Sequence, residues 1–168
     1  EAPVADDLVA ELTRIPGVTA VVGERTADWQ YGGGPISIDA YDPAYFVSSD
    51  FGQWPLAGRG LPDLWHTVAR GEGAVVSSNF ALNLHVKVGD TITLDSPSGP
   101  VALQVVGVVT HFASPRGTVE MSRDVYKRFW RDAKVTRAFV RTDPKADRAV
   151  VRAAIARQRG RTYNLRIL

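Results

Sequence analysis

Residues 73–94 have the sequence GAVVSSNFALNLHVKVGDTITL, which predicts three short elements in succession. The apolar run 74–76 predicts a buried strand. The polar residues 77–79 follow it and can cap a helix that ends near Leu84, because a side-chain oxygen satisfies free amides at a helix start. A Gly-Asp pair then predicts a turn, and the alternation of residues 91–94 predicts a second strand.

The residues that follow extend this pattern into a β-hairpin. Residues 95–100 have the sequence DSPSGP, in which Pro and Gly supply the backbone angles of a turn. The apolar-rich run from Val101 to Thr110 then predicts a long strand that pairs with residues 91–94. Residues 73–110 therefore predict a compact β-rich lobe.

The N-terminal residues predict a helix followed by two strands. Apolar residues recur at helical spacing before the breaker Pro16-Gly17, and Pro3 fits the first helical turn. Residues 18–22 predict a strand, and residues 36–40 predict another after a Gly-Gly-Gly-Pro connection. The apolar stripe of the helix consists of Val4, Leu8, Leu12 and Ile15.

The C-terminal residues return to alternating helices and strands. Ser122 can cap a helix that ends near Trp130, and residues 135–141 predict a strand. Asp143-Pro144 predicts the start of a second helix, Gly160 its end, and residues 162–168 a last strand. Residues 43–70 show no periodic pattern and predict an irregular segment. The order predicts an α+β fold with two lobes, an α/β lobe interrupted by a β-rich insertion.

Composition excludes several classes of protein. The chain has 168 residues, of which 45% are apolar and 23% charged, as in globular domains. It has no Cys, which excludes a disulfide framework, a thiol nucleophile and a Cys-ligated zinc site. No apolar run approaches the ~18–20 residues that a membrane-spanning helix requires.

Charge is distributed unevenly along the sequence. Residues 1–112 have five basic and thirteen acidic side chains, a net charge of −8, whereas residues 113–168 have fifteen basic and five acidic, a net charge of +10. A basic segment favours nucleic acid or anionic lipid as a partner. No nucleic-acid-binding motif accompanies it, so we expect these arginines to cover solvated faces and expect no nucleic acid partner.

The residues with catalytic potential form no recognisable site. His66, His85 and His111 lie far apart in the sequence, without ligand spacing that would indicate a metal. Asp39 and Asp42 flank a tyrosine at a strand end, where solvation is commoner than paired-acid catalysis. We therefore predict that the chain is not an enzyme and has no catalytic, cofactor-binding or metal-binding residues.

Three aromatic side chains leave two interpretations open. Phe51, Trp54 and Trp65 lie in the irregular segment among Pro and Gly residues. They form either the core of the smaller lobe or a patch that contacts a partner or substrate, since Trp is enriched in binding hot spots.

The segment of residues 73–94 resembles a recurrent pattern of one protein family. An apolar strand, a small polar cap, a short Ala-Leu helix and then V-G-D-x-I-x-L are typical of the extracytoplasmic core domain of MacB/FtsX/LolC-type ABC transporter permeases. The strand 105–109, the junction 15–18 and the segment 119–122 are similar to the corresponding parts of that family. The resemblance covers nearly the whole chain in the order of its elements.

The resemblance implies a domain organisation and a location. It implies a Porter-like α/β lobe formed by residues 1–50 and 113–168, with a Sabre-like β-rich lobe at residues 51–112. It also implies membrane helices before Glu1 and after Leu168, so we expect both ends on one side of the fold. The domain would then lie on the extracytoplasmic side of the cell membrane, periplasmic or extracellular.

The resemblance also implies a mechanical function. A separate cytoplasmic ABC ATPase would bind ATP, and this domain, with no cofactor of its own, would couple the resulting movement to substrate export or partner control. The implied partners are the ATPase, a second permease copy or relative, and an extracytoplasmic protein. Arg148, Arg152 and Arg159 become candidates for contact with the nearby membrane.

Two other functions stay open at this point. The first is a free-standing β-barrel-containing module that binds a ligand or polymer, which a deep apolar pocket lined by Trp54 and Trp65 would favour. The second is an enzyme whose site is assembled from scattered residues, which a cleft gathering His and carboxylate side chains would favour.

Overall fold

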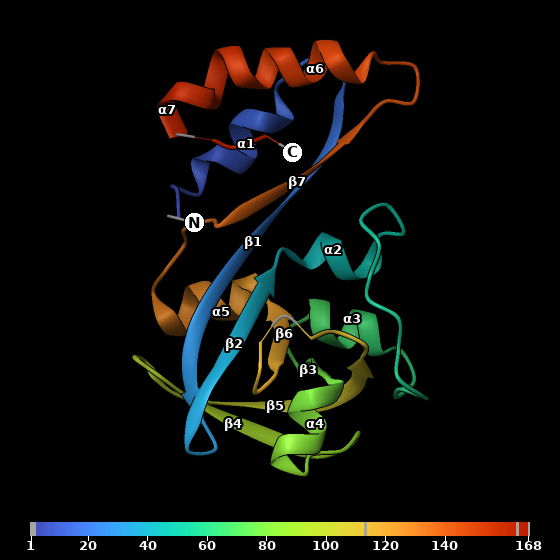
Figure 1. The fold of residues 1–168 in the computed structure, drawn as a ribbon, viewed down its shortest axis with the longest axis vertical. Helices are drawn as coiled ribbons and strands as arrows, with labels where there is room; N and C mark the ends of the chain where they lie inside the picture. Colours follow the sequence, from blue (N-terminus) through green and yellow to red (C-terminus); the bar gives the residue numbers. More distant parts are fainter. Residues whose placement is uncertain (1–2, 113, 164, 168) are drawn as a thin grey trace. The chain divides into compact units, whose positions relative to one another are not determined.

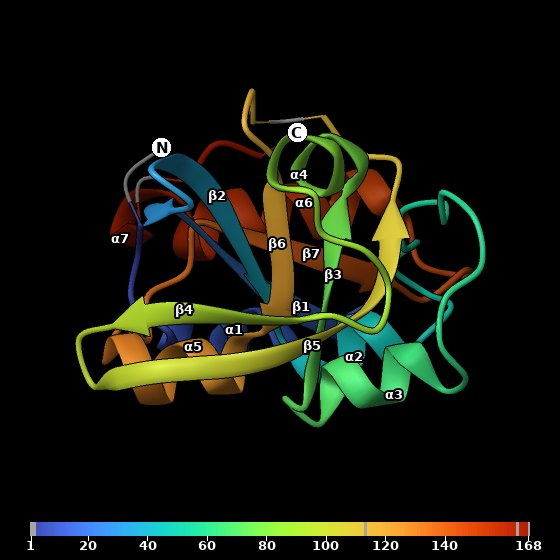
Figure 2. The same cartoon turned by 90° about the horizontal axis from the view of Figure 1, so that it is seen from below.

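The computed structural model describes residues 3–112, 114–163 and 165–167 (Figures 1 and 2). It is an α+β fold, as predicted. The strands are β1 (Val18–Tyr31), β2 (Gly34–Tyr41), β3 (Gly73–Ser77), β4 (Thr91–Ser96), β5 (Gly99–Val109), β6 (Thr118–Ser122) and β7 (Arg137–Thr142). The helices are α1 (Asp7–Thr13), α2 (Pro43–Val47), α3 (Leu64–Ala69), α4 (Ser78–Leu84), α5 (Arg123–Trp130), α6 (Arg148–Ile155), the π-helix η1 (Ala156–Gly160) and α7 (Arg161–Tyr163).

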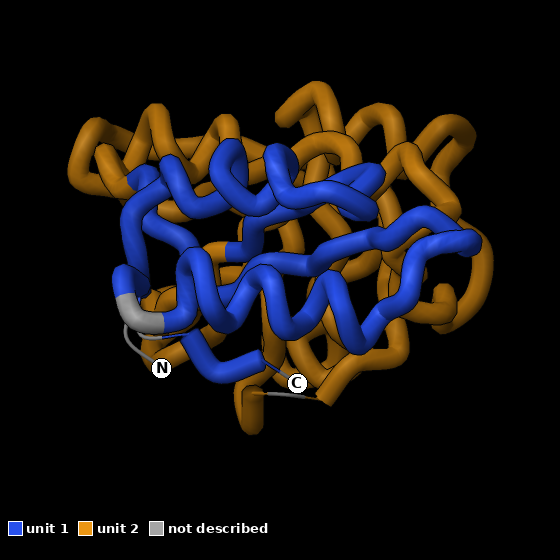
Figure 3. Tube along the Cα trace, turned by 90° about the horizontal axis from the view of Figure 1, so that it is seen from above, with its two compact units in different colours: residues 1–24, 133–168 blue, residues 25–132 orange. Residues whose placement is uncertain are grey.

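The chain forms two compact units (Figure 3). Unit 1 combines residues 1–24 with residues 133–168, and unit 2 is the continuous segment 25–132. These limits differ from those of the two predicted lobes, because β2 and β6 lie in unit 2. The Porter-like and Sabre-like boundaries stay a prediction from the resemblance.

The division into units weakens the charge contrast seen along the sequence. Unit 1 has eleven basic and seven acidic residues, a net charge of +4. Unit 2 has nine basic and eleven acidic residues, a net charge of −2. The acidic N-terminal helix and the basic C-terminal helices share one unit, which offsets much of the asymmetry.

Unit 2 contains a mixed sheet with the strand order β4-β5-β3-β6-β2-β1. The pairs β2–β6 and β3–β5 are parallel, whereas β3–β6 and β4–β5 are antiparallel. One face of this sheet packs against α4 and α5 and forms the main apolar core. The core residues include Ile36, Ile38, Ala40, Val76, Phe80, Leu103, Val119, Met121, Tyr126 and Trp130.

The predicted capped helix and hairpin are confirmed within unit 2. The Ser77 hydroxyl accepts a hydrogen bond from the Phe80 amide at the start of α4, which identifies Ser77 as the capping residue. Strands β4 and β5 pair over residues 91–104. At the hairpin turn, the Ser98 amide donates to the Phe129 carbonyl of α5. Figure 2 shows this hairpin passing over α5.

Two short helices lie where the sequence predicts only irregular structure. Helices α2 and α3 pack against each other; α2 also packs against β2, and α3 against β3, β5 and β6. They have five and six residues, too few to show a 3.6-residue period. The prediction for residues 43–70 is therefore wrong in these two places.

Unit 1 has its own apolar core between α1, α6 and the β1–β7 pair. Antiparallel pairing joins residues 18–24 of β1 to β7. Leu8, Leu12, Ile15, Val151 and Ile155 are buried together. Residues near both ends of the chain, Val4, Leu165 and Ile167, pack against this same cluster. The expected proximity of residues 1 and 168 themselves lies outside the described residues.

Several predictions at the ends of elements are wrong. Pro3 precedes α1, because Val4 pairs with Val135 in an isolated β-bridge. Asp143 forms a turn, and Asp147 instead caps α6 by accepting a hydrogen bond from the Ala149 amide. The helix predicted to end at Gly160 continues from η1 into α7. In the segment predicted as a strand at 162–168, residues 162 and 163 belong to α7, and residues 165–167 are not in a strand. Their apolar side chains pack on the core of unit 1 without a strand partner.

Gly117 provides a test of the packing between α4 and β6. It has a φ of +111°, and a Cβ at this position would overlap the backbone of Phe80 at the start of α4. We expect Gly117→Ala to lower the free energy of unfolding by about 3 kcal/mol or more, as measured by urea denaturation.

Gly58→Ala is the matched control for this substitution. Gly58 has a similar φ of +102°, but no atom lies within 4 Å of the added Cβ. We expect it to cost only the ~1 kcal/mol of the backbone conformation. Equal losses of unfolding free energy in Gly117→Ala and Gly58→Ala would contradict the close packing of Phe80 against Gly117.

Candidate functional site

A pair of buried carboxyl groups lies on the face of the sheet opposite the apolar core of unit 2. Asp39 of β2 and Glu120 of β6 occupy paired positions in adjacent parallel strands. Alternation along each strand places Ile38, Ala40, Val119 and Met121 in the core and turns both carboxyl groups the other way. Their residues are only 5% and 1% exposed. Acidic side chains are rarely buried this deeply without a partner.

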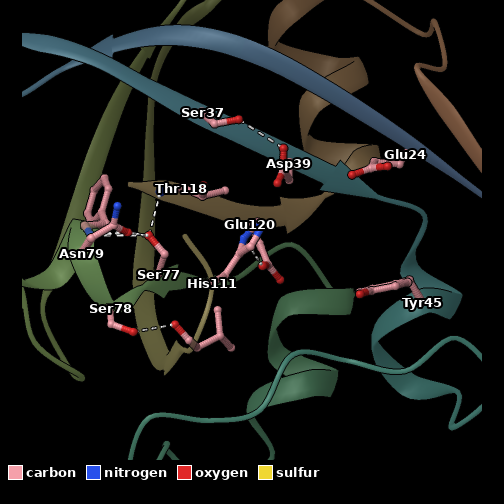
Figure 4. Close-up of polar contacts among 12 residues, drawn as sticks. Glu24, Ser37, Asp39, Tyr45, Ser77, Ser78, Asn79, His111, Thr118 and Glu120 are labelled. Carbon is pink, nitrogen blue, oxygen red and sulfur yellow. Dashed lines mark hydrogen bonds and ion pairs between the residues drawn. The ribbon is translucent and has the colours of Figure 1, made fainter. Parts of the chain in front are cut away.

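His111, in the loop after β5, covers Glu120 (Figure 4). Its Nδ1 atom lies 3.4 Å from Glu120 Oε1. The indole ring of Trp54 stacks on the imidazole, with a centroid distance of 4.5 Å and an interplanar angle of 15°. Trp54, His111 and Glu120 therefore form a stack that runs from the surface to the sheet.

Burial raises the pKa of Glu120, because the charged carboxylate loses its hydration. The His111 contact lowers the pKa of Glu120, and the nearby Asp39 carboxylate raises it, so the net direction is upward. Among the described residues, neither carboxyl oxygen of Glu120 has a hydrogen-bond partner. Asp39 differs, because the Ser37 hydroxyl donates to its Oδ1 at 3.2 Å.

A second polar group at the edge of this face fixes the start of α4. The Ser77 hydroxyl accepts a hydrogen bond from the Thr118 amide at 2.8 Å and lies 2.6 Å from Asn79 Oδ1 (Figure 4). The Ser78 hydroxyl donates to the Val109 carbonyl at 3.1 Å. These bonds join α4 to β5 and β6, so we assign this group a structural role.

Residues 53–61, which we call the strap, run beside the end of β5. Three backbone hydrogen bonds of 2.8 Å hold the strap: Ala57 donates to Val108, Leu61 donates to Val106, and the Thr110 amide donates to Pro55. Gln53 precedes them and donates from its side-chain amide to the Phe46 carbonyl at the end of α2. The strap therefore connects α2 to the loop that contains His111.

An open cavity of about 350 Å³ lies beside the strap, between α2 and α3. This volume is at the lower end of the range for small-molecule sites. Trp65 is among the lining residues but Trp54 is not, so the described residues do not form here the deep apolar pocket lined by both that a ligand-binding module would favour. The lining residues are Phe46, Val47, Ser48, Ser49, Gln53, Leu61, Asp63, Leu64, Trp65 and His66.

The three predicted aromatic contact residues do not form one cluster. Trp65 lines the cavity and stacks on Phe46 with a centroid distance of 6.3 Å. Trp54 is 40% exposed and stacks on His111 instead. Phe51 is half-buried in the segment before the strap. Their role in binding a partner or substrate stays a prediction.

The other residues considered from the sequence lie apart from one another. His66 contacts Asp63 at the surface at 2.8 Å, and His85 ends α4 with a φ of +54°. Asp42 pairs with Arg123 at 2.7 Å. The sequence did not reveal that Asp39 lies beside Glu120 in the paired strand.

The arginines predicted to contact the membrane lie on α6 and just beyond it. Arg148 and Arg152 are exposed, and Arg152 donates to the Ile167 carbonyl at 2.9 Å. Arg159 forms an ion pair with Glu11 of α1 at 2.8 Å, so its charge is partly offset within unit 1. Arg148 and Arg152 are therefore the more exposed of the three arginines predicted to contact the membrane.

Other kinds of site find little support in the part of the chain that the structure describes. No group of three or more His, Asp or Glu side chains there is placed to hold a metal ion. No helix within those same residues is long and apolar enough to cross a bilayer. The chemistry that the buried cluster can perform is to bind and release a proton.

Comparison with known proteins identifies consistent relatives. The family model described as the MacB-like periplasmic core domain matches residues 1–158. The ABC transporter permease protein Rv0987 of Mycobacterium tuberculosis is 31% identical over 144 residues, which cover 80% of this chain and 16% of that protein. The chain thus spans about a sixth of this relative's length.

Two solved structures share the fold. The extracellular domain of the ABC-type transporter YknZ from Gram-positive bacteria has a TM-score of 0.69 and 13% identity, covering 98% of this chain and 86% of that one. The periplasmic region of MacB from Actinobacillus actinomycetemcomitans has a TM-score of 0.69 and 10% identity, covering 96% of this chain and 75% of that one. At such identities the likeness is one of fold.

The ion pair between Arg123 of α5 and Asp42, which follows β2, can be tested for its contribution to stability. Arg123 is 2% exposed, and its removal leaves the Asp42 carboxylate without this partner in a largely buried place. We expect Arg123→Ala to lower the free energy of unfolding by about 3 kcal/mol, measured by urea denaturation.

Arg70→Ala is the control, because Arg70 pairs with Asp63 and Glu72 at the surface. We expect Arg70→Ala to lower the free energy of unfolding much less than Arg123→Ala does, because exposed ion pairs contribute little to stability. A loss at Arg123 no larger than the loss at Arg70 would refute a stabilising role for the buried pair.

Proposed function

The chain belongs to the MacB-like periplasmic core domain family, and we propose that it couples ATP-driven movement of an ABC transporter permease to events outside the membrane. Those events are substrate export or the control of an extracytoplasmic partner protein. The match of the family model over residues 1–158 is the observation that carries this proposal. The family is one of transporter permease domains rather than of enzymes.

The arrangement of unit 1 supports a mechanical role. Residues near both ends of the chain, Val4 and Ile167, pack on the same apolar cluster. In a full permease with membrane helices on both sides of this domain, movement of either helix would act on one packed unit. Packed units of this kind shift as whole bodies rather than deforming continuously.

Strand β1 offers a route for such movement into unit 2. It runs without interruption from Val18 to Tyr31, and the division between the units falls after Glu24. The first half of β1 pairs with β7 in unit 1, and Trp29 and Tyr31 pack against the core of unit 2. A displacement of the first half would therefore be passed along a hydrogen-bonded strand.

The proposal includes partners that this domain does not itself contain. An ABC ATPase would bind and hydrolyse ATP in the cytoplasm, and a second permease copy or relative would complete the membrane assembly. The exposed Trp54 and the cavity residue Trp65 are the proposed contacts with a substrate or an extracytoplasmic protein.

Spin labels can test whether the two units move during the ATPase cycle. The 168 residues contain no Cys, so within this domain labels attach only at introduced positions. We expect the distance distribution between labels at Arg152→Cys in unit 1 and Leu82→Cys in unit 2 to change when ATP is added. The measurement is pulsed electron spin resonance on the full permease, assembled with its ATPase in lipid.

A pair of labels within unit 2, at Leu82→Cys and Thr93→Cys, is the control. Both positions are exposed, and the distance between them should stay constant through the cycle. An inter-unit distance that is equally constant would refute coupling by unit movement, while a change within unit 2 would show that the units are not the moving bodies.

The exposed arginines of α6 give a second test, of contact with anionic lipid. Each basic residue near an anionic surface contributes about 1 kcal/mol, so we expect Arg148→Glu with Arg152→Glu to weaken binding to phosphatidylglycerol vesicles by roughly 30-fold or more. Vesicle co-sedimentation of the 168-residue chain at low salt measures this binding.

The same change of charge in unit 2 serves as the control. Arg59→Glu with Arg128→Glu alters two exposed arginines there and should leave vesicle binding nearly unchanged. Absence of binding by the unaltered chain would refute the lipid contact, and equal weakening by both double variants would show that only net charge matters.

A further inference from the structure

The proposed transport function uses Trp54 as a contact but gives no role to His111 and Glu120, which lie beneath it. We propose that Asp39, Glu120 and His111 bind a proton that keeps the strap closed over the sheet, and that loss of this proton releases the strap. The inference concerns unit 2 alone and does not depend on the coupling proposed above.

Three backbone hydrogen bonds tie the strap to one edge of β5. Its first residue, Gln53, also donates to the carbonyls of residues 45, 46 and 48, so the start of the strap is the better anchored end. Most of its residues are exposed, and the space beside Gly58 is open. Segments with few buried apolar contacts open with small free energies. Trp54 supplies the largest side-chain contact between the strap and the His111 loop.

The hydration of the Glu120 carboxyl group depends on whether Trp54 is stacked on His111. With the strap closed, Trp54 covers His111 and His111 covers Glu120, so water has little access to the carboxyl oxygens. An isolated carboxylate in such a place is costly, whereas a protonated carboxyl, or a carboxylate beside a protonated imidazole, carries no net charge. In both arrangements the His111–Glu120 pair holds one proton.

Loss of that proton leaves a buried negative charge next to a second carboxylate. Asp39 faces Glu120 from the paired position of β2, so the two charges repel each other. Opening of the strap would relieve this cost by admitting water to Glu120. The closed strap is thus favoured on the acidic side, and the open strap is favoured as the pH rises.

Among the described residues, His111 and Asp39 are the charged groups that shift the pKa of Glu120. From α2 the Tyr45 hydroxyl donates to the Gly52 carbonyl, and β3 places Val75 opposite Glu120. The charged side chains at α3 pair with each other at the surface: Asp63, His66, Arg70 and Glu72. Arg123 of α5 pairs with Asp42.

The direction of the pH effect follows from the raised pKa of Glu120. A carboxyl whose pKa is higher in the closed form binds its proton more tightly there than in the open form. Closure is therefore favoured below the pKa of the exposed carboxyl, and this contribution is lost as the pH rises through the raised pKa of the closed form.

Fluorine NMR can follow the strap directly. The chain has four Trp residues, so labelling with 5-fluorotryptophan gives four signals, which single Trp→Phe variants assign. We expect the Trp54 signal to titrate at a pH above that at which an ordinary glutamate ionises, and the Trp65 signal to stay constant over the same range. Over the same range, protection of the Ala57 and Leu61 amides from hydrogen exchange should fall by more than base catalysis explains.

Glu120→Gln is the decisive variant, since its amide is neutral at every pH in this range. We expect it to abolish the Trp54 titration and to keep the Ala57 and Leu61 amides protected at high pH. Asp63→Asn, at an exposed carboxylate beside His66, is the matched control and should keep the wild-type titration. A flat Trp54 signal in the wild type, or an unchanged titration in Glu120→Gln, would overturn the proposal.

His111→Phe separates the roles of the two partners and serves if Glu120→Gln does not fold. Phe keeps an aromatic ring for Trp54 to stack on but cannot share a proton. Because His111 lowers the pKa of Glu120, its removal should move the midpoint of the Trp54 titration to higher pH. An unchanged midpoint would show that the imidazole takes no part in proton binding.

Discussion

The parallel pairing of β2 with β6 is the constraint on which unit 2 depends. The pair is covered on both faces, by α4 and α5 on one side and by α2, α3 and the strap on the other. Strands covered on both faces are usually apolar throughout. Here one face is apolar and the other is polar, so the second face must satisfy or neutralise its polar groups in place. The Ser77 hydroxyl is satisfied by hydrogen bonds. In our proposal, the charge of Glu120 is neutralised by a bound proton.

The sequence predicted those elements whose signals lie within a few residues of one another. The Ser77 cap, the β4–β5 hairpin and the apolar stripe of α1 follow from local spacing, and the structure confirms them. The family was also recognised from residues 73–94. Errors occurred where two local signals competed, as at Asp143 and Asp147, since both are capping residues and tertiary contacts select the second.

The candidate site could not be predicted in the same way. Asp39, Trp54, His111 and Glu120 come together from four separate segments, and no spacing rule connects them. The strand itself is misleading, because the alternation in TVEMS is typical of a half-exposed strand with Glu120 on the solvent side. The structure instead buries all five residues, because segments distant in the sequence cover the second face.

The register of β1 against β7 limits how unit 1 can rearrange. Residues 20–24 pair in sequence with residues 137–141, and Val21, Ala138 and Val140 pack on the α1–α6 core, whereas Val22 is buried but is not part of that core. A slide by one residue would exchange the two faces of the strand, so only shifts of two residues, about 6.8 Å, keep the same side chains on the core. Under mechanical load, the β1–β7 pair would therefore keep its register until the force is large enough to shift the strands by two residues at once.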